Sequence, residues 1–209
     1  MQYSTALSDG ILAMACLASL LWLRPIFTGQ PVMRALLLGF GLTATAALCG
    51  AVRYGLDPSW IDKHRSFTQL SAALGLPLLG LAALALSRGW AWSRSIWTLC
   101  LLALVGLFIG ARVLGVDPHY RLGLNLVTLL LILYAGLRRW PQLQPGLQAI
   151  GVVGLFLIAG LVVGTEGFIG TLRRVDLLHA LLTLAYPLLA WLLLTLRKPA
   201  REEIPVKTL

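Results

Sequence analysis

The chain has 209 residues, of which 58% are hydrophobic and only 12% are charged. Soluble domains carry about 25% charged residues, and so few charges cannot cover so much apolar surface in water. Together with a mean hydropathy of +0.84, this excludes a disordered chain, a disulfide scaffold and a soluble enzyme. It predicts an all-α, polytopic transmembrane bundle. The net charge of +9 forms no basic patch with interleaved aromatic residues, so we expect no nucleic-acid partner.

Seven apolar segments are long enough to cross a bilayer as helices, which takes about 20 residues each. They cover residues 7–24, 33–54, 68–87, 95–114, 121–137, 146–164 and 175–196. We therefore expect a single seven-helix domain over residues 1–196 and a short cytoplasmic tail at 197–209. The N-terminus has neither a basic region nor a small-residue cleavage site after the first apolar run, so the first span is expected to be retained.

The basic residues between the spans predict the orientation, because loops rich in Lys and Arg stay in the cytoplasm. Ten of them lie on the side of the tail and seven on the side of the N-terminus. This places the N-terminus outside and the C-terminus in the cytoplasm, and we expect a bacterial inner membrane. All three histidines and all six acidic residues that precede the tail then fall on the outer side.

An internal repeat is visible at the ends of two spans. Residues 50–60 and 110–120 share the pattern G-A-x-x-x-G-[LV]-D-P-x-[aromatic], and a fainter likeness relates the surroundings of Pro77 and Pro187. We interpret the chain as one helix plus three hairpins that run in the same direction. The Asp-Pro pairs predict helix stops at the outer surface, whereas Pro77 and Pro187 are expected to kink or open their spans.

Polar residues recur at the outer ends of the odd-numbered spans, where ionisable side chains usually face the bundle interior or a wet cavity. Asp176 and His179 are three residues apart, so they share one helical face, a pairing that suits a catalytic base or a metal ligand. With Asp9 they form the candidate catalytic set. Alternatively, Asp9 and Asp176 only cap their helices, and Arg53 neutralises them. The candidate substrate- or anion-binding residues are Arg53, Gln69, Asn125 and Glu166.

Three short segments, LSDGILA at 7–13, CGAVRYG at 49–55 and VDLLH at 175–179, resemble an uncharacterised family of bacterial seven-helix membrane proteins. More distantly, the layout is similar to the CREST superfamily of membrane hydrolases, in which zinc held by three histidines, with an aspartate and a serine nearby, cleaves lipid amides. The resemblance implies zinc as a possible cofactor. Arg53 stands where the family has a histidine, so the implied zinc ligands would be His179 together with His64 and His119, both of which we expect in loops.

Three functions follow as hypotheses. The first is a non-enzymatic accessory or scaffolding subunit of a membrane complex, with an outward-facing polar or lipid-binding pocket; its partners are membrane lipids and other membrane protein subunits. Many glycines, which let helices pack closely in a membrane, favour it. The second is a CREST-like, metal-dependent hydrolase that acts on lipid or amide substrates. The third is a small-solute transporter or sensor.

Overall fold

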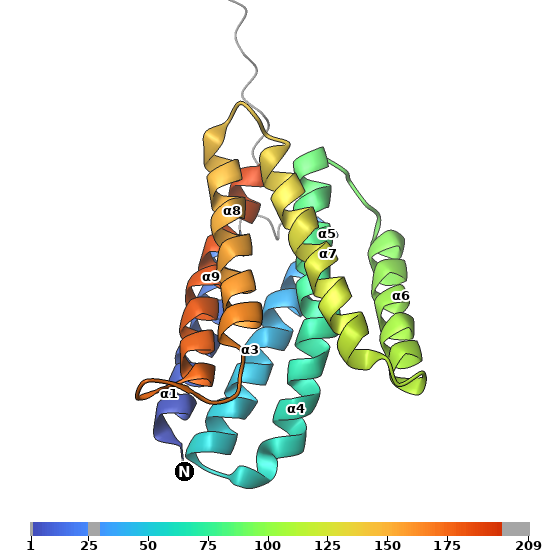
Figure 1. Ribbon diagram of the computed structural model, residues 1–209. Coiled ribbons are helices and arrows are strands. Elements are labelled where there is room, and N and C mark those ends of the chain that lie inside the picture. Colours follow the sequence, from blue (N-terminus) through green and yellow to red (C-terminus); the bar gives the residue numbers. More distant parts are fainter. Residues whose placement is uncertain (1, 25–29, 198–209) are drawn as a thin grey trace, which may run out of the picture.

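The computed structural model describes residues 2–24 and 30–197 (Figure 1). Within these residues, seven helical segments are long and apolar enough to cross a membrane. The prediction of an all-α seven-helix membrane bundle is therefore confirmed. Of the tail expected at 197–209, residues 198–209 lie outside the described part of the chain.

The third span is longer than the sequence predicted. The first two spans are α1 (Tyr3–Trp22) and α3 (Met33–Gly55). The third is built from η1 (Pro58–Trp60), α4 (Ile61–Leu70), a π-helical turn η2 (Ser71–Gly75) and α5 (Leu76–Arg88). The expected start at residue 68 is wrong, because the helix continues into the charged run 62–65. Its 31 residues rise about 46 Å, more than the roughly 30 Å thickness of a hydrocarbon core. The sequence prediction missed the first part because hydropathy does not report a helical extension made of polar residues.

The remaining elements complete the bundle. They are α6 (Arg94–Val113), α7 (Asp117–Leu137), α8 (Leu143–Leu157), η3 (Ile158–Val163), the strands β1 (Phe168–Ile169) and β2 (Leu172–Arg173), and α9 (Arg174–Arg197). The two short strands pair antiparallel and form a small hairpin ahead of α9. Local sequence explains several ends: the Ser93 side chain caps α6 through the Ile96 N–H, and Gly89, with φ +68°, ends α5.

One end of the bundle carries the N-terminus and the turns that follow α3, α6 and η3, and we call it the N-terminal face (Figure 1). The charge distribution predicts that this face is external. Helix α6 stands at the edge of the bundle beside α7, whereas α3, α5 and α9 lie nearer its centre (Figure 1). The two copies of the repeat pattern fall at corresponding places, around the ends of α3 and α6 at this face.

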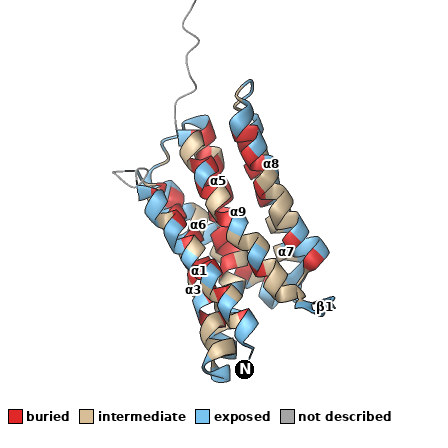
Figure 2. Ribbon diagram, turned by 90° about the vertical axis from the view of Figure 1, so that its left-hand side faces the viewer, coloured by how far each residue is buried: buried red, intermediate tan, exposed pale blue. Residues whose placement is uncertain are grey.

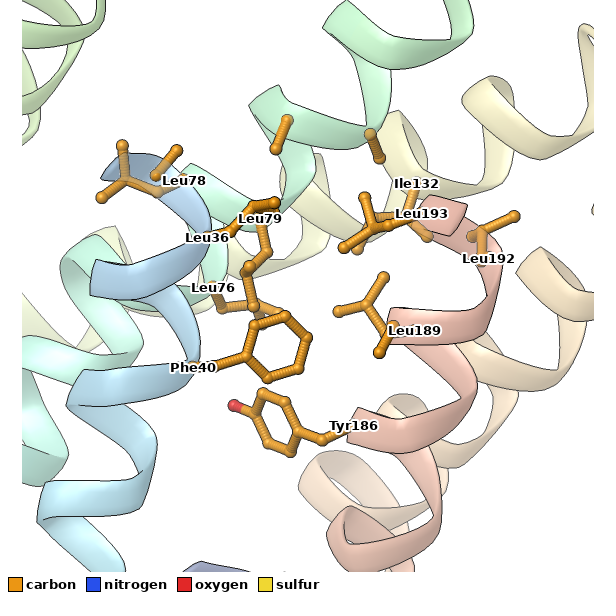
Figure 3. Close-up of a cluster of buried hydrophobic side chains, with 14 of the residues drawn as sticks. Leu36, Phe40, Leu76, Leu78, Leu79, Ile132, Tyr186, Leu189, Leu192 and Leu193 are labelled. Carbon is orange, nitrogen blue, oxygen red and sulfur yellow. The ribbon is translucent and has the colours of Figure 1, made fainter. Parts of the chain in front are cut away.

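A dense apolar core fills the half of the bundle away from the N-terminal face (Figure 3). Phe40 and Tyr186 meet edge to face there with centroids 5.7 Å apart, and Leu189 and Leu193 are fully buried beside them. The buried residues of α5 and α9 face inward along much of these helices (Figure 2). Gly39 allows α3 and α5 to approach, because a Cβ there would collide with the Leu79 side chain. This packing closes the bundle beneath the site described next.

Two arginines at the opposite face hold helix ends together. Arg138 donates to the Ser87 carbonyl at 3.0 Å, and Arg139 donates to the Leu196 and Leu86 carbonyls at 2.5 and 3.4 Å. The last carbonyls of a helix have no partner within it, and a cation there also interacts favourably with the helix dipole. The basic residues that predict orientation therefore also tie the ends of α5 and α9 to the α7–α8 turn.

Candidate functional site

A cavity of about 840 Å³ lies between α1, α3, α4, η2, α7, η3 and α9. Its mouth is at the N-terminal face, where Arg53, His64, Glu166 and Arg173 line it. Its walls are mostly apolar, and its lining includes Tyr186, the member of the core cluster in Figure 3 that lies nearest the N-terminal face. A volume of this size fits the range of small-molecule sites, about 300–1,000 Å³.

The candidate catalytic set converges at one side of the cavity, where Asp9 and His179 line the wall and Asp176 lies behind it. Asp9 Oδ1 lies 3.4 Å from His179 Nδ1, and the Ser8 hydroxyl lies 3.1 Å from the same nitrogen. Ser8 also reaches Asp176 Oδ1 at 3.4 Å, so one serine from α1 bridges both members of the α9 pair. The structure thus brings together Asp9, Asp176 and His179, as their positions on the first and last spans predicted.

The alternative that Asp9 caps its helix is wrong. Helix α1 begins at Tyr3 with Gln2 as its N-cap, so Asp9 lies almost two turns inside the helix and is 1% exposed. Its carboxylate packs directly against α3 at Gly50, where a Cβ would collide with it. Asp9 Oδ2 has no hydrogen-bond partner among the described residues. A buried carboxylate so tightly enclosed is a feature of the site and not of a helix end.

The contact between Asp9 and His179 has a chemical consequence. A carboxylate against Nδ1 fixes the orientation and tautomer of an imidazole and leaves Nε2 to exchange protons with another group. His179 lines the cavity, so that group would be a molecule bound there. Asp176 is not among the residues that line the cavity; it acts on His179 through its charge and through the shared contact with Ser8.

The mouth of the cavity carries positive charge, and no carboxylate of the described residues forms an ion pair with Arg53 or Arg173 there. Arg53 donates to His64 Nδ1 at 3.1 Å, and its guanidinium lies 4.6 Å from the centre of the Tyr54 ring. Because a guanidinium only donates, His64 accepts through Nδ1 and is neutral in this arrangement. Arg53 makes no direct ion pair with Asp9 or Asp176 among the described contacts, although its charge favours the ionised form of Asp9 from a distance.

The deep part of the cavity holds three hydroxyl groups. Thr43 Oγ1 lies 2.7 Å from Ser71 Oγ and 2.9 Å from Tyr186 Oη, and all three side chains line the cavity. They come from α3, η2 and α9, and each is at most 9% exposed. No sequence pattern indicates this cluster, because uncharged hydroxyl residues in the middle of apolar spans are ordinary. Only their meeting in space is informative.

Other predicted site residues divide into two groups. Asn125 and Glu166 line the cavity. Gln69 does not, because it accepts a hydrogen bond from Arg112 at 2.9 Å on the outside of the bundle. His64 and His119 are not in loops, contrary to expectation: they lie in α4 and in the first turn of α7.

The implied zinc site does not form. His119 is exposed and lies outside the cavity, and His64 bonds Arg53 with the nitrogen that faces it. Across residues 2–24 and 30–197, no three His, Cys, Asp or Glu side chains come close enough to hold a metal ion. The residues present therefore do not fit the three-histidine zinc centre that the CREST resemblance implies.

The fold and the cavity define a polytopic helical membrane protein with a ligand-sized pocket that is open at one face and closed at the other. The chain belongs to the family of unknown function DUF6962, whose family model matches residues 4–198. No curated protein and no solved structure matches the chain.

Proposed function

We propose that this protein is a non-enzymatic accessory or scaffolding subunit of a membrane complex in a bacterial inner membrane, and that it holds an anionic amphiphile in its cavity. The observation that carries the proposal is the combination of apolar walls with Arg53 at the mouth, a cation that forms no direct ion pair with a described carboxylate. The predicted orientation would open this mouth to the outer leaflet, where a lipid headgroup can meet the guanidinium while its chain enters the cavity.

Arg53 is well placed to bind an anion. Its contacts with His64 and Tyr54 hold the guanidinium at the rim, so little side-chain freedom is lost on binding. Arg173, which lines the same mouth, stacks over Phe168 at 5.6 Å and supplies a second cation. Glu166 is the one acidic residue among the described mouth residues, which leaves the mouth with a positive balance.

Binding of defined amphiphiles to the purified full-length protein tests the proposal. The probes are stearate, 1-stearoyl lysophosphatidate and the neutral 1-stearoyl glycerol, measured by native mass spectrometry in detergent. A charge-assisted hydrogen bond gives the anionic probes an advantage of about 10- to 100-fold over the neutral one. Stearate and lysophosphatidate together distinguish a carboxylate from a phosphate headgroup.

The matched variants are Arg53→Gln and Arg112→Gln. The first should remove most of the advantage of the anionic probes, because only Arg173 then remains at the mouth. The second removes an arginine that bonds Gln69 away from the cavity and should change nothing. Equal binding of charged and neutral probes to the unaltered protein, or no binding of any probe, would overturn the proposal.

A second candidate function, hydrolysis of a lipid or amide bond, is favoured by one observation, the Asp9–His179 contact. This pair has the geometry of an oriented general base, and it stands on the cavity wall. The proposal of a distant CREST relationship depends on the same residues. A hydrolysis assay with N-acyl amides and lysolipids tests this second function. Turnover that falls at least 100-fold in His179→Ala supports an enzyme, whereas turnover that the variant leaves unchanged comes from a contaminant.

A further inference from the structure

We infer that the hydroxyl cluster Thr43–Ser71–Tyr186 is a second binding subsite, which selects amphiphiles that carry a hydroxyl group in the middle of the chain. This inference deepens the proposed function and depends on it, because the subsite lies in the same cavity, whose lining continues past the cluster to Leu76 and Leu129. The argument rests on the hydrogen-bond balance of the cluster, its depth below Arg53, and the wall that joins the two.

The hydrogen bonds of the cluster leave acceptors free. The carbonyl of Gly39 can only accept, and it lies 3.3 Å from Thr43 Oγ1, so the Thr43 hydroxyl donates to it. The Tyr186 hydroxyl then donates to Thr43 Oγ1. All three protons are used, because the Ser71 hydroxyl can donate to Thr43 or to Tyr186, while the Ser71 oxygen keeps its two lone pairs unused. A hydroxyl group on a ligand is the donor that this arrangement lacks.

The cluster is held in position before any ligand arrives. The Tyr186 ring is fixed by edge contacts with Phe40 at 5.7 Å and with Phe156 at 5.4 Å. Ser71 begins the π-helical turn η2, a distortion that is frequent at functional sites. The hydroxyl oxygens therefore present a fixed target, which favours specific binding because little has to be ordered on association.

The depth of the cluster sets the position of the hydroxyl group on the ligand. Thr43 and Arg53 are ten residues apart on α3, which corresponds to about 15 Å along the helix axis. Between them the α3 wall is lined by the small residues Ala46 and Ala47, which leave room for an alkyl chain. An extended 12-hydroxystearate, with its carboxylate at Arg53, places its hydroxyl group at a comparable depth.

Three ligands of equal chain length test the inference on the full-length protein: stearate, 2-hydroxystearate and 12-hydroxystearate. We expect 12-hydroxystearate to bind about three- to tenfold more tightly than the other two, the contribution of one neutral hydrogen bond. The 2-hydroxy isomer has the same polarity, but its hydroxyl group stays at the mouth. Equal affinity for all three would overturn the inference while leaving the proposed function intact. Failure of all three to bind would refute the inference, and failure of lysophosphatidate as well would refute the proposed function too.

Two variants assign the preference to the cluster. Tyr186→Phe removes one hydroxyl and keeps the ring, and Ser71→Ala removes another from a different helix, so at least one is expected to fold as judged by gel filtration. Either should abolish the preference for 12-hydroxystearate without weakening stearate. Tyr134→Phe, which removes a hydroxyl that bonds Arg88 outside the cavity, should retain it. A preference that survives in both cluster variants refutes the assignment.

Discussion

The contact between Gly50 of α3 and the Asp9 carboxylate predicts that Gly50→Ala destabilises the protein. An ideal Cβ at position 50 would lie 2.7 Å from Asp9 Cγ and 2.9 Å from its Oδ1, with Oδ2 closer still. The Asp9 side chain has no space to move into, because it is 1% exposed and its other side faces His179. The added methyl therefore has to separate α1 from α3.

The magnitude is the balance of two effects. Overpacking of a buried site costs about 1–3 kcal/mol, and the enclosed carboxylate places this case near the upper end. Replacing a glycine inside a helix by alanine gains about 0.5–1 kcal/mol. The net loss is about 2 kcal/mol, which corresponds to a fall in Tm of roughly 4–8 °C for a chain of this length. Intrinsic-fluorescence melting of the detergent-purified protein measures it.

A control is available in the same helix. Gly41 has nothing within 4 Å of its ideal Cβ position, so Gly41→Ala should leave Tm unchanged or raise it slightly. The double variant Asp9→Ala/Gly50→Ala should show little further loss beyond Asp9→Ala alone, because the colliding group is gone. If Gly50→Ala melts like Gly41→Ala, Asp9 does not pack against α3 as described.

Three further predictions concern other parts of the molecule. Arg139→Gln should lower Tm by several degrees, since hydrogen bonds from a charged donor are worth about 1.5–3 kcal/mol. Arg94→Gln at the exposed start of α6 serves as the control. If the two variants melt alike, the bonds from Arg139 to the Leu86 and Leu196 carbonyls do not stabilise the bundle. The pKa of Asp57 is held below its usual range by the hydrogen bonds it accepts from the Ser59 N–H and hydroxyl. The hydrogen bonds to Asp57 are therefore present above about pH 4 and are lost as pH falls through the lowered pKa. Asp57→Ala should speed amide hydrogen exchange at Ser59 at pH 7, and unchanged exchange would count against this cap. Because the histidines do not converge, elemental analysis should find less than one zinc per chain, and a full equivalent that is lost in His119→Ala would contradict this geometry.

The class of protein and the span count could be read from the sequence, because crossing a bilayer requires about 20 apolar residues per helix and each run is visible by itself. The shared helical face of Asp176 and His179 follows from their spacing alone. Local chemistry of this kind needs no knowledge of the rest of the fold.

Hydropathy failed where a polar segment is helical. The run around His64 looks like a loop because it is charged, yet it continues the third span beyond the apolar stretch. The position of Asp9 near the first apolar run similarly suggested a cap, although helix α1 starts well before it. In both cases the helix extends past the apolar residues, and backbone hydrogen bonding, which hydropathy does not report, decides where it ends.

The meeting of distant side chains was decided only by the tertiary structure. Thr43, Ser71 and Tyr186 come from three helices, and Asp9 reaches His179 across 170 positions of the chain. Each span is apolar on nearly every side because it is surrounded by lipid or by other helices, so periodicity does not reveal which residues face inward. Helix packing sets that choice, through close approaches such as Asp9 against Gly50, and with it the cavity that carries the proposed function.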